Sequence, residues 1–234
     1  KILLKKQLNI YDKTLLNTCK TSLKSFEYDF DLIPINHQEN SLISIMELSS
    51  EHSSYIFNKK IDYVNLINKL QNLECYTNSI ILNMEKGMQK SITLPKVIAV
   101  KLLEQFESFK KNKSYKNNNI KFKLDFDFNK IVEQYVVPSL NKIIDFLKNR
   151  YIHKCRKSIG LCGLKNGDQM YKFLVKNTTS MNSISIDFIH NYGLKEVDRI
   201  YKEMMKIKQQ HEFKGSLKDF SKYLKNLDKY KFKD

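Results

Sequence analysis

Proline and glycine are scarce in this chain, and their scarcity limits the folds open to it more than any other feature. The 234 residues include only 3 prolines and 6 glycines. Both residues interrupt helices, so a chain almost without them favours long helices. No segment shows a convincing two-residue alternation, the pattern of a half-buried strand. The sequence predicts a mainly α fold, a multi-helix array of long antiparallel-packed helices, with about six or seven helices and little or no sheet.

Apolar residues recur at spacings of three and four along most of the chain, the period of an amphipathic helix. The segment at 28–57 lacks this period and predicts an ordered connection with short helical turns and an extended piece at 31–36. The helices are predicted at residues 8–27, 60–87, 95–111, 127–154, 168–177 and 185–207.

Individual residues predict where these helices begin, end or bend. Gly87 is a natural C-terminal glycine, and Ser185 can cap the last helix with Asp187 in its first turn. Pro138 should kink or divide its helix. Gly193 interrupts an apolar stripe in the last helix, which predicts that another helix approaches closely there.

A Lys/Asn-rich run at about 110–120 has no apolar face and predicts a mobile surface loop. It is also the best candidate for a domain boundary, although a loop within one domain explains it equally well. The whole chain, residues 1–234, is interpreted as one helical part of a larger domain.

The net charge is +16 and the pI is near 9.5. Lysine and asparagine are spread along the whole chain, as in products of AT-rich genes. Dedicated nucleic-acid binders favour arginine forks, and here arginine occurs only at Arg150, Arg156 and Arg199. A nucleic-acid partner is therefore disfavoured. No apolar run is long enough for a membrane span or a signal peptide, and the compartment stays open.

Candidate chemical motifs are incomplete. Cys19, Cys75, Cys155 and Cys162 form no CxxC pair and predict buried free thiols. The five histidines, His37, His52, His153, His190 and His211, have no second histidine three or four residues away. The stretch "HEFKG" places Gly215 where a zinc-binding HExxH motif needs a histidine. Gly160, Gly163 and Gly167 lack the spacing of a phosphate-binding loop and predict tight turns. No catalytic residue and no metal ligand can be named in this chain.

Two stretches, "GLCGLKNGDQMYKFLVKNTT" and "IHNYGLKEVDRIYKEM", resemble the signature region of the DUF885 family. Members read GL-x-x-LP-x-G-x-x-YY, a TT pair, and then IH-x-x-GL-x-EV-x-RI-x-x-EM. The helix pair at 62–107 and the "LIPINH" stretch are similar to the family as well, so the resemblance covers most of the chain. Three residues depart from the pattern: Lys165 replaces a usual proline, Ser91 a usual glycine and Met170 a usual tyrosine.

The resemblance implies a zinc metallopeptidase of the gluzincin-related group. Family members carry an HExxPGH-like metal motif well downstream of the IH-x-x-GL helix, so this motif is expected beyond Asp234. This chain then corresponds to the helical N-terminal portion, and its partners are the C-terminal catalytic part and a peptide substrate. Zinc is expected in a full-length member, where it would polarise a peptide carbonyl and activate water. Within this chain the resemblance points to four residues of the substrate cleft or its surroundings: Tyr171, Thr178, Thr179 and His190.

Structural roles remain open for these four residues, because Thr178 and Thr179 can cap a helix and His190 can bind a backbone carbonyl. Two other functions also remain open. The chain can be a non-catalytic helical binding or scaffold module with an exposed apolar face. The less favoured reading is a basic nucleic-acid-binding domain, which requires steeply salt-dependent binding.

Overall fold

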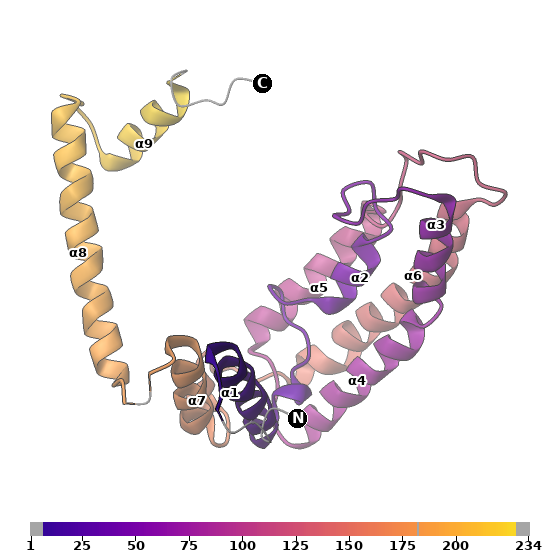
Figure 1. Cartoon of the computed structure of the whole chain (residues 1–234), viewed down its shortest axis with the longest axis horizontal. Coiled ribbons are helices and arrows are strands. Elements are labelled where there is room, and N and C mark those ends of the chain that lie inside the picture. The colour runs from indigo at the N-terminus through magenta and orange to yellow at the C-terminus, as the bar shows by residue number, and fades with distance from the viewer. Residues whose placement is uncertain (1–6, 182, 228–234) are drawn as a thin grey trace. The chain divides into compact units, whose positions relative to one another are not determined.

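The structure is a computed structural model that describes residues 7–181 and 183–227 (Figure 1). The described residues form no β-strand, and the mainly α class is confirmed; an isolated β-bridge joins Pro95 and Arg156. In chain order the α-helices of this part are α1 (Ile10–Ser25), α2 (Ser41–Glu47), α3 (Lys60–Leu70), α4 (Leu73–Gln89), α5 (Lys96–Lys111), α6 (Phe128–Phe146), α7 (Gly167–Thr179), α8 (Ile186–Gln210) and α9 (Leu217–Asn226).

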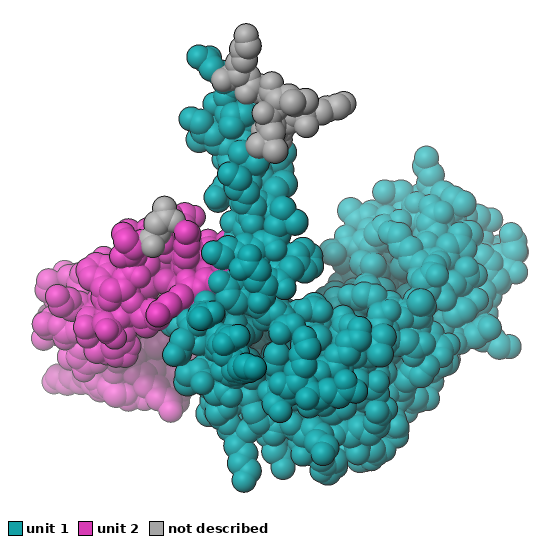
Figure 2. Space-filling view, turned by 90° about the horizontal axis from the view of Figure 1, so that it is seen from below, with its two compact units in different colours: residues 1–171 teal, residues 172–234 magenta. Residues whose placement is uncertain are grey.

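The chain divides into two compact units, residues 1–171 and residues 172–234, which Figure 2 colours teal and magenta. The dividing point falls inside α7. The Lys/Asn-rich run at 110–120 lies within the first unit, so it is not the boundary between the two. Each unit is described separately below.

Helix α6 is the centre of the first unit and packs against α3, α4 and α5. Figure 1 shows α4 and α6 running side by side. An aromatic cluster fills one end of this core: Tyr63 stacks on Phe57 at 4.2 Å and meets the edge of Phe128 at 5.0 Å. Each fully buried side chain of this size contributes about 1.5–3 kcal/mol, so these apolar stripes hold the helices together.

The segment from Lys60 to Gly87 forms two helices instead of one. Helix α3 ends at Leu70 and α4 begins at Leu73, with Gln71 and Asn72 between them. Both helices keep their apolar stripes against the same core, which is why the period continues through the break.

Gly87 lies in the last turn of α4, two residues before its end, and is not the terminating residue. A Cβ at this position would lie 2.5 Å from the carbonyl oxygen of Ile92 and 2.9 Å from that of Leu32. Glycine is required because two backbone segments approach the helix here. The residue with left-handed backbone geometry at this turn is Ser91, with φ of 60°.

Helix α6 begins where the sequence predicted, because the side chain of Asp127 accepts a hydrogen bond from the N–H of Lys130 at 3.0 Å. The helix continues through Pro138 without a break, so the predicted division at this residue is wrong. The helices on either side hold α6 through its buried residues, and this packing outweighs the backbone hydrogen bond that proline cannot make.

Helix α1 does not bury the apolar face that its sequence pattern predicted. Five large apolar side chains of α1 and its C-terminal end are exposed, namely Ile10, Tyr11, Leu15, Leu23 and Phe26. A capping box between Asn9 and Asp12 fixes the start of the helix. Local interactions therefore define α1 more than packing does.

The second unit contains α8 and α9. The hydroxyl of Ser185 accepts a hydrogen bond from the N–H of Phe188 at 3.1 Å, which confirms the predicted cap of α8. Phe220 of α9 is buried against Phe213 and Tyr223, with ring centres 5.3 Å and 6.3 Å away. No helix in the described part of the chain is long and apolar enough to cross a membrane.

Candidate functional site

Arg156 organises the segment that leads into the DUF885-like signature. Its Nε donates to the carbonyl of Thr93 at 2.9 Å, and its Nη1 donates to the carbonyls of Ser158 and Gly160 at 2.6 and 2.7 Å. Its backbone N–H donates to the Thr93 hydroxyl at 3.1 Å, and its carbonyl accepts from the N–H of Lys96 at 2.8 Å. One side chain thus connects the turn before α5 to the glycine-rich loop.

The glycines of that loop are needed for close backbone packing. A Cβ on Gly163 would lie 1.9 Å from the hydroxyl oxygen of Ser158, and one on Gly167 would lie 1.8 Å from the carbonyl oxygen of Leu161. The predicted tight turns are confirmed. Asn166, next to Gly167, has φ of 61°, a region that asparagine tolerates better than most residues.

Tyr151 and Cys155 lie beside Arg156 and are shielded from water. The Tyr151 hydroxyl accepts a hydrogen bond from the backbone N–H of Leu94 at 2.9 Å, and burial raises its pKa. Burial also raises the pKa of the Cys155 thiol to about 11, although nearby Lys96 and Arg156 oppose this shift. The thiol is therefore protonated at neutral pH and is a weak nucleophile.

The cysteines differ from the prediction in one respect. All four thiols are free, as expected, but Cys19, Cys75 and Cys162 are exposed and only Cys155 is partly buried. The expectation of buried thiols is wrong for three of them. Cys19 belongs to the apolar stripe of α1, which packs little, so its place in that stripe gives it no cover.

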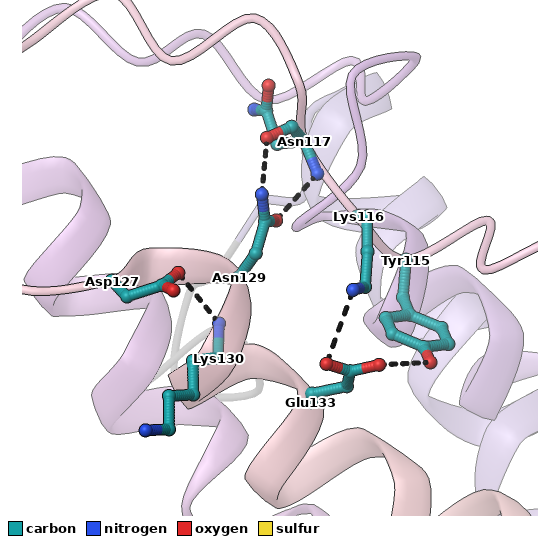
Figure 3. A network of polar contacts seen from close by, with 7 residues as sticks. All are labelled: Tyr115, Lys116, Asn117, Asp127, Asn129, Lys130 and Glu133. Atoms are coloured by element: carbon teal, nitrogen blue, oxygen red, sulfur yellow. Dashed lines mark hydrogen bonds and ion pairs between the residues drawn. The ribbon is translucent and has the colours of Figure 1, made fainter.

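The Lys/Asn-rich run is attached to the core by the network in Figure 3. The Asn129 side chain accepts from the N–H of Asn117 at 2.9 Å and donates to its carbonyl at 2.8 Å. Glu133 accepts from the Tyr115 hydroxyl at 3.4 Å and pairs with Lys116 at 3.2 Å. Burial, and then Glu133, raise the pKa of Tyr115. Tyr115 is 2% exposed and Asn117 is 5% exposed, so the expectation of a run without buried residues is wrong.

Helix α8 presents an apolar face that the described residues leave uncovered. None of its 25 residues is buried. Val197, Ile200 and Met204 lie on one side of the helix and are 66%, 48% and 45% exposed. Gly193 lies on the same side. The prediction that another helix approaches it is wrong for the described residues, because nothing lies within 4 Å of a Cβ built there.

The four residues that the resemblance singled out are exposed and do not form a common site. Tyr171, 44% exposed, is in α7 and belongs to the first unit. Thr178 and Thr179 end α7, where the Thr179 hydroxyl donates to the Val175 carbonyl at 2.8 Å and accepts from the N–H of Met181 at 3.2 Å. His190 is in the second turn of α8. No hydrogen bond or ion pair connects any two of the four in the described part of the chain.

The donor groups of the described residues do not fit zinc. No three His, Cys, Asp or Glu side chains come together as a metal site in residues 7–181 and 183–227. His190 has no acidic residue that faces it as an ion-pair partner within these ranges, and His211 packs its ring near Phe220 at 5.6 Å. No chemical step through a metal is therefore derived for this chain.

Sequence reasoning did not identify the role of Arg156, which it treated only as part of a weak basic patch. One signal was available: an arginine immediately precedes the glycine-rich stretch, and a guanidinium group can bind several carbonyls that glycines leave accessible. The partner segment around Thr93 lies 63 residues away and carries no such signal.

The family model described as "Bacterial protein of unknown function (DUF885)" matches residues 4–234 of the chain. The chain therefore belongs to the DUF885 family. No curated protein and no solved structure matches it.

Proposed function

We propose that this chain is the helical N-terminal portion of a DUF885-type zinc metallopeptidase, which hydrolyses peptide bonds in the full-length protein. Membership of the family over residues 4–234 supports the assignment to a DUF885 domain. The zinc ligands would come from the catalytic part of the domain, because the described residues of this chain do not fit the metal. This chain would form a wall of the substrate cleft.

The observation that carries the proposal is the uncovered apolar face of α8. A 25-residue helix without a buried residue is not held by its own unit. A water-soluble domain does not usually leave so long an apolar stripe exposed, and such a surface marks an interaction site. The catalytic part of the same domain is the partner that family membership supplies.

The candidate cleft residues take definite roles under this proposal. His190 lies one turn before Gly193, near the edge of the apolar face, so a part packed on α8 would reach it. Tyr171 and the Thr178–Thr179 pair offer hydroxyl groups to a peptide backbone. Thr179 also closes α7, so a structural role remains open for it.

The test compares His190→Ala with His52→Ala in the full-length protein. His52 is an exposed histidine outside the signature region, which makes it a matched control. A loss of peptide hydrolysis with His190→Ala alone, at an unchanged melting temperature, supports the cleft role. Equal rates in both variants and the wild type would reject it. A full-length product without bound zinc and without hydrolysis would reject the peptidase proposal itself.

The same surfaces also support a second candidate, a non-catalytic helical binding or scaffold module. Both α1 and α8 expose apolar faces, and a scaffold needs such faces for its partners. Self-association of the isolated chain, measured by sedimentation, supports this alternative if the natural product lacks hydrolysis. A monomer at high concentration counts against it.

A further inference from the structure

Gly193 interrupts the apolar face of α8 without a reason inside the described chain. Glycine weakens a helix relative to alanine. No atom lies within 4 Å of a Cβ built at this position, so alanine would fit without a clash. Gly87 and Gly167 differ, because neighbouring backbone carbonyls exclude a side chain there. The space at Gly193 is therefore available to something outside the described residues.

The position of Gly193 in the helix defines what the space can accept. Val197, Ile200 and Met204 follow it at steps of four, three and four, so all four residues face the same side. A glycine in such a row forms a notch between larger side chains. A helix that crosses at the notch can bring its backbone close to that of α8, as small residues allow between packed helices.

The charges beside this face are paired within α8. Arg199 pairs with Glu196 at 2.8 Å, Lys202 with Asp198 at 2.6 Å, and Lys206 with Glu203 at 3.3 Å. Because each of these cations has an acidic partner on the same helix, the face offers little free positive charge to phosphates or anionic lipids. Its charge pattern instead complements an uncharged, apolar protein surface.

We infer that a helix from the zinc-carrying part of the DUF885 domain covers the apolar face of α8 and crosses it at Gly193. The inference rests on the proposed function, which supplies that part. The crossing helix places its backbone against Gly193 and its apolar side chains against Val197, Ile200 and Met204. The imidazole of His190, beside Gly193, then becomes buried at the edge of the contact.

Gly193→Ala tests the inference through a change of sign. In the isolated chain, alanine should slow hydrogen exchange of the amides at 190–204 by about fivefold, because it favours the helix and meets no neighbour. In the full-length protein, the same variant should speed exchange there, because the new methyl group separates the packed helices. Asn191→Ala is the matched control: the residue is exposed on the opposite side of α8, and its replacement should slow exchange in both proteins.

Slower exchange with Gly193→Ala in both proteins would overturn the inference. Exchange of wild-type α8 that is as fast in the natural product as in the isolated chain would also overturn it. A dimer of the isolated chain with a protected α8 would identify a second copy as the occupant and overturn it too. Zinc content and peptide hydrolysis are measured separately. An inactive product with a protected α8 and the change of sign would reject the peptidase activity and support the contact.

Discussion

The hydroxyl of Tyr151 accepts a hydrogen bond from the backbone N–H of Leu94 at 2.9 Å, across 57 residues of chain. Both groups are buried, so neither can exchange its partner for water. This bond joins the end of the α6 region to the turn that precedes α5. With the contacts of Arg156, it holds the start of the signature region on the first unit.

Tyr151→Phe should lower the free energy of unfolding by about 1–3 kcal/mol, because it leaves the buried N–H of Leu94 without an acceptor. Urea denaturation followed by circular dichroism measures the change. Tyr135→Phe is the control, since the Tyr135 hydroxyl has no hydrogen-bond partner among the described residues. Equal stability of the two variants would contradict the role assigned to the Tyr151 hydroxyl.

Arg156→Lys should destabilise the first unit by about 2–4 kcal/mol, although it keeps the charge. A single ammonium group cannot reach the carbonyls of Thr93, Ser158 and Gly160 together in the geometry of the guanidinium fork. Arg150→Lys serves as the control. Arg150 pairs with Glu85 in a half-exposed position, and its replacement should cost less than about 1 kcal/mol. Thermal unfolding of both variants decides the matter.

Ser91→Gly should stabilise the protein by about 0.5–1 kcal/mol, because glycine removes the steric cost of a left-handed backbone. The φ of Ser91 is 60°, and DUF885 proteins resembling this chain usually have glycine at this place. Ser91→Ala retains the steric cost and should give no gain. A gain of the same size from alanine in chemical denaturation would show that the backbone angle is not the cause.

Asn129→Ala should release the Lys/Asn-rich run from the core. It removes both bonds to the backbone of Asn117 and leaves a buried N–H and a buried carbonyl unpaired, at a cost of about 1–3 kcal/mol. Exchange of the Asn117 amide and tryptic cleavage after Lys113 should both become faster. Asn149→Ala is the control, because that exposed amide bonds only to Asp145. Unchanged cleavage in Asn129→Ala would mean that other contacts hold the run.

Cys155 should react with iodoacetamide more slowly than Cys162 at pH 8, because its thiol is partly buried and its pKa is raised to about 11. Its folded-state pKa lies above the model value of 9.0, so its protonated form is favoured by folding. The associated stability is fully present below pH 9 and is lost as the pH rises through about 11. Mass spectrometry of labelled peptides gives the rates. Equal rates for the two thiols would contradict the burial of Cys155.

Local patterns predicted the helical class and several helix ends correctly. Ser185 and Asp127 cap their helices as expected, because a cap depends only on residues within the next turn. The resemblance in the signature region identified the family that residues 4–234 match. The break between α3 and α4 was missed, since an apolar period that faces one core continues through it.

The proposed cleft residues show where local reasoning stops. A helical period places His190 near the apolar face of α8, but it cannot say whether anything covers that face. The period of α1 predicted burial equally well, and its apolar residues are exposed. A pattern describes the surface that a helix can bury, and a partner decides whether it does.

The sequence by itself determined the helices, their caps and the family, because these depend on neighbouring residues and on a continuous motif. Only the tertiary structure decided that Arg156 binds the backbone of Thr93, that Asn129 holds Asn117, and that Gly87 is required by two approaching carbonyls. Thr93 lies 63 residues before Arg156. Contacts of this kind form between residues that lie far apart along the chain, so their free energies depend on three-dimensional packing and leave no regular period in the sequence.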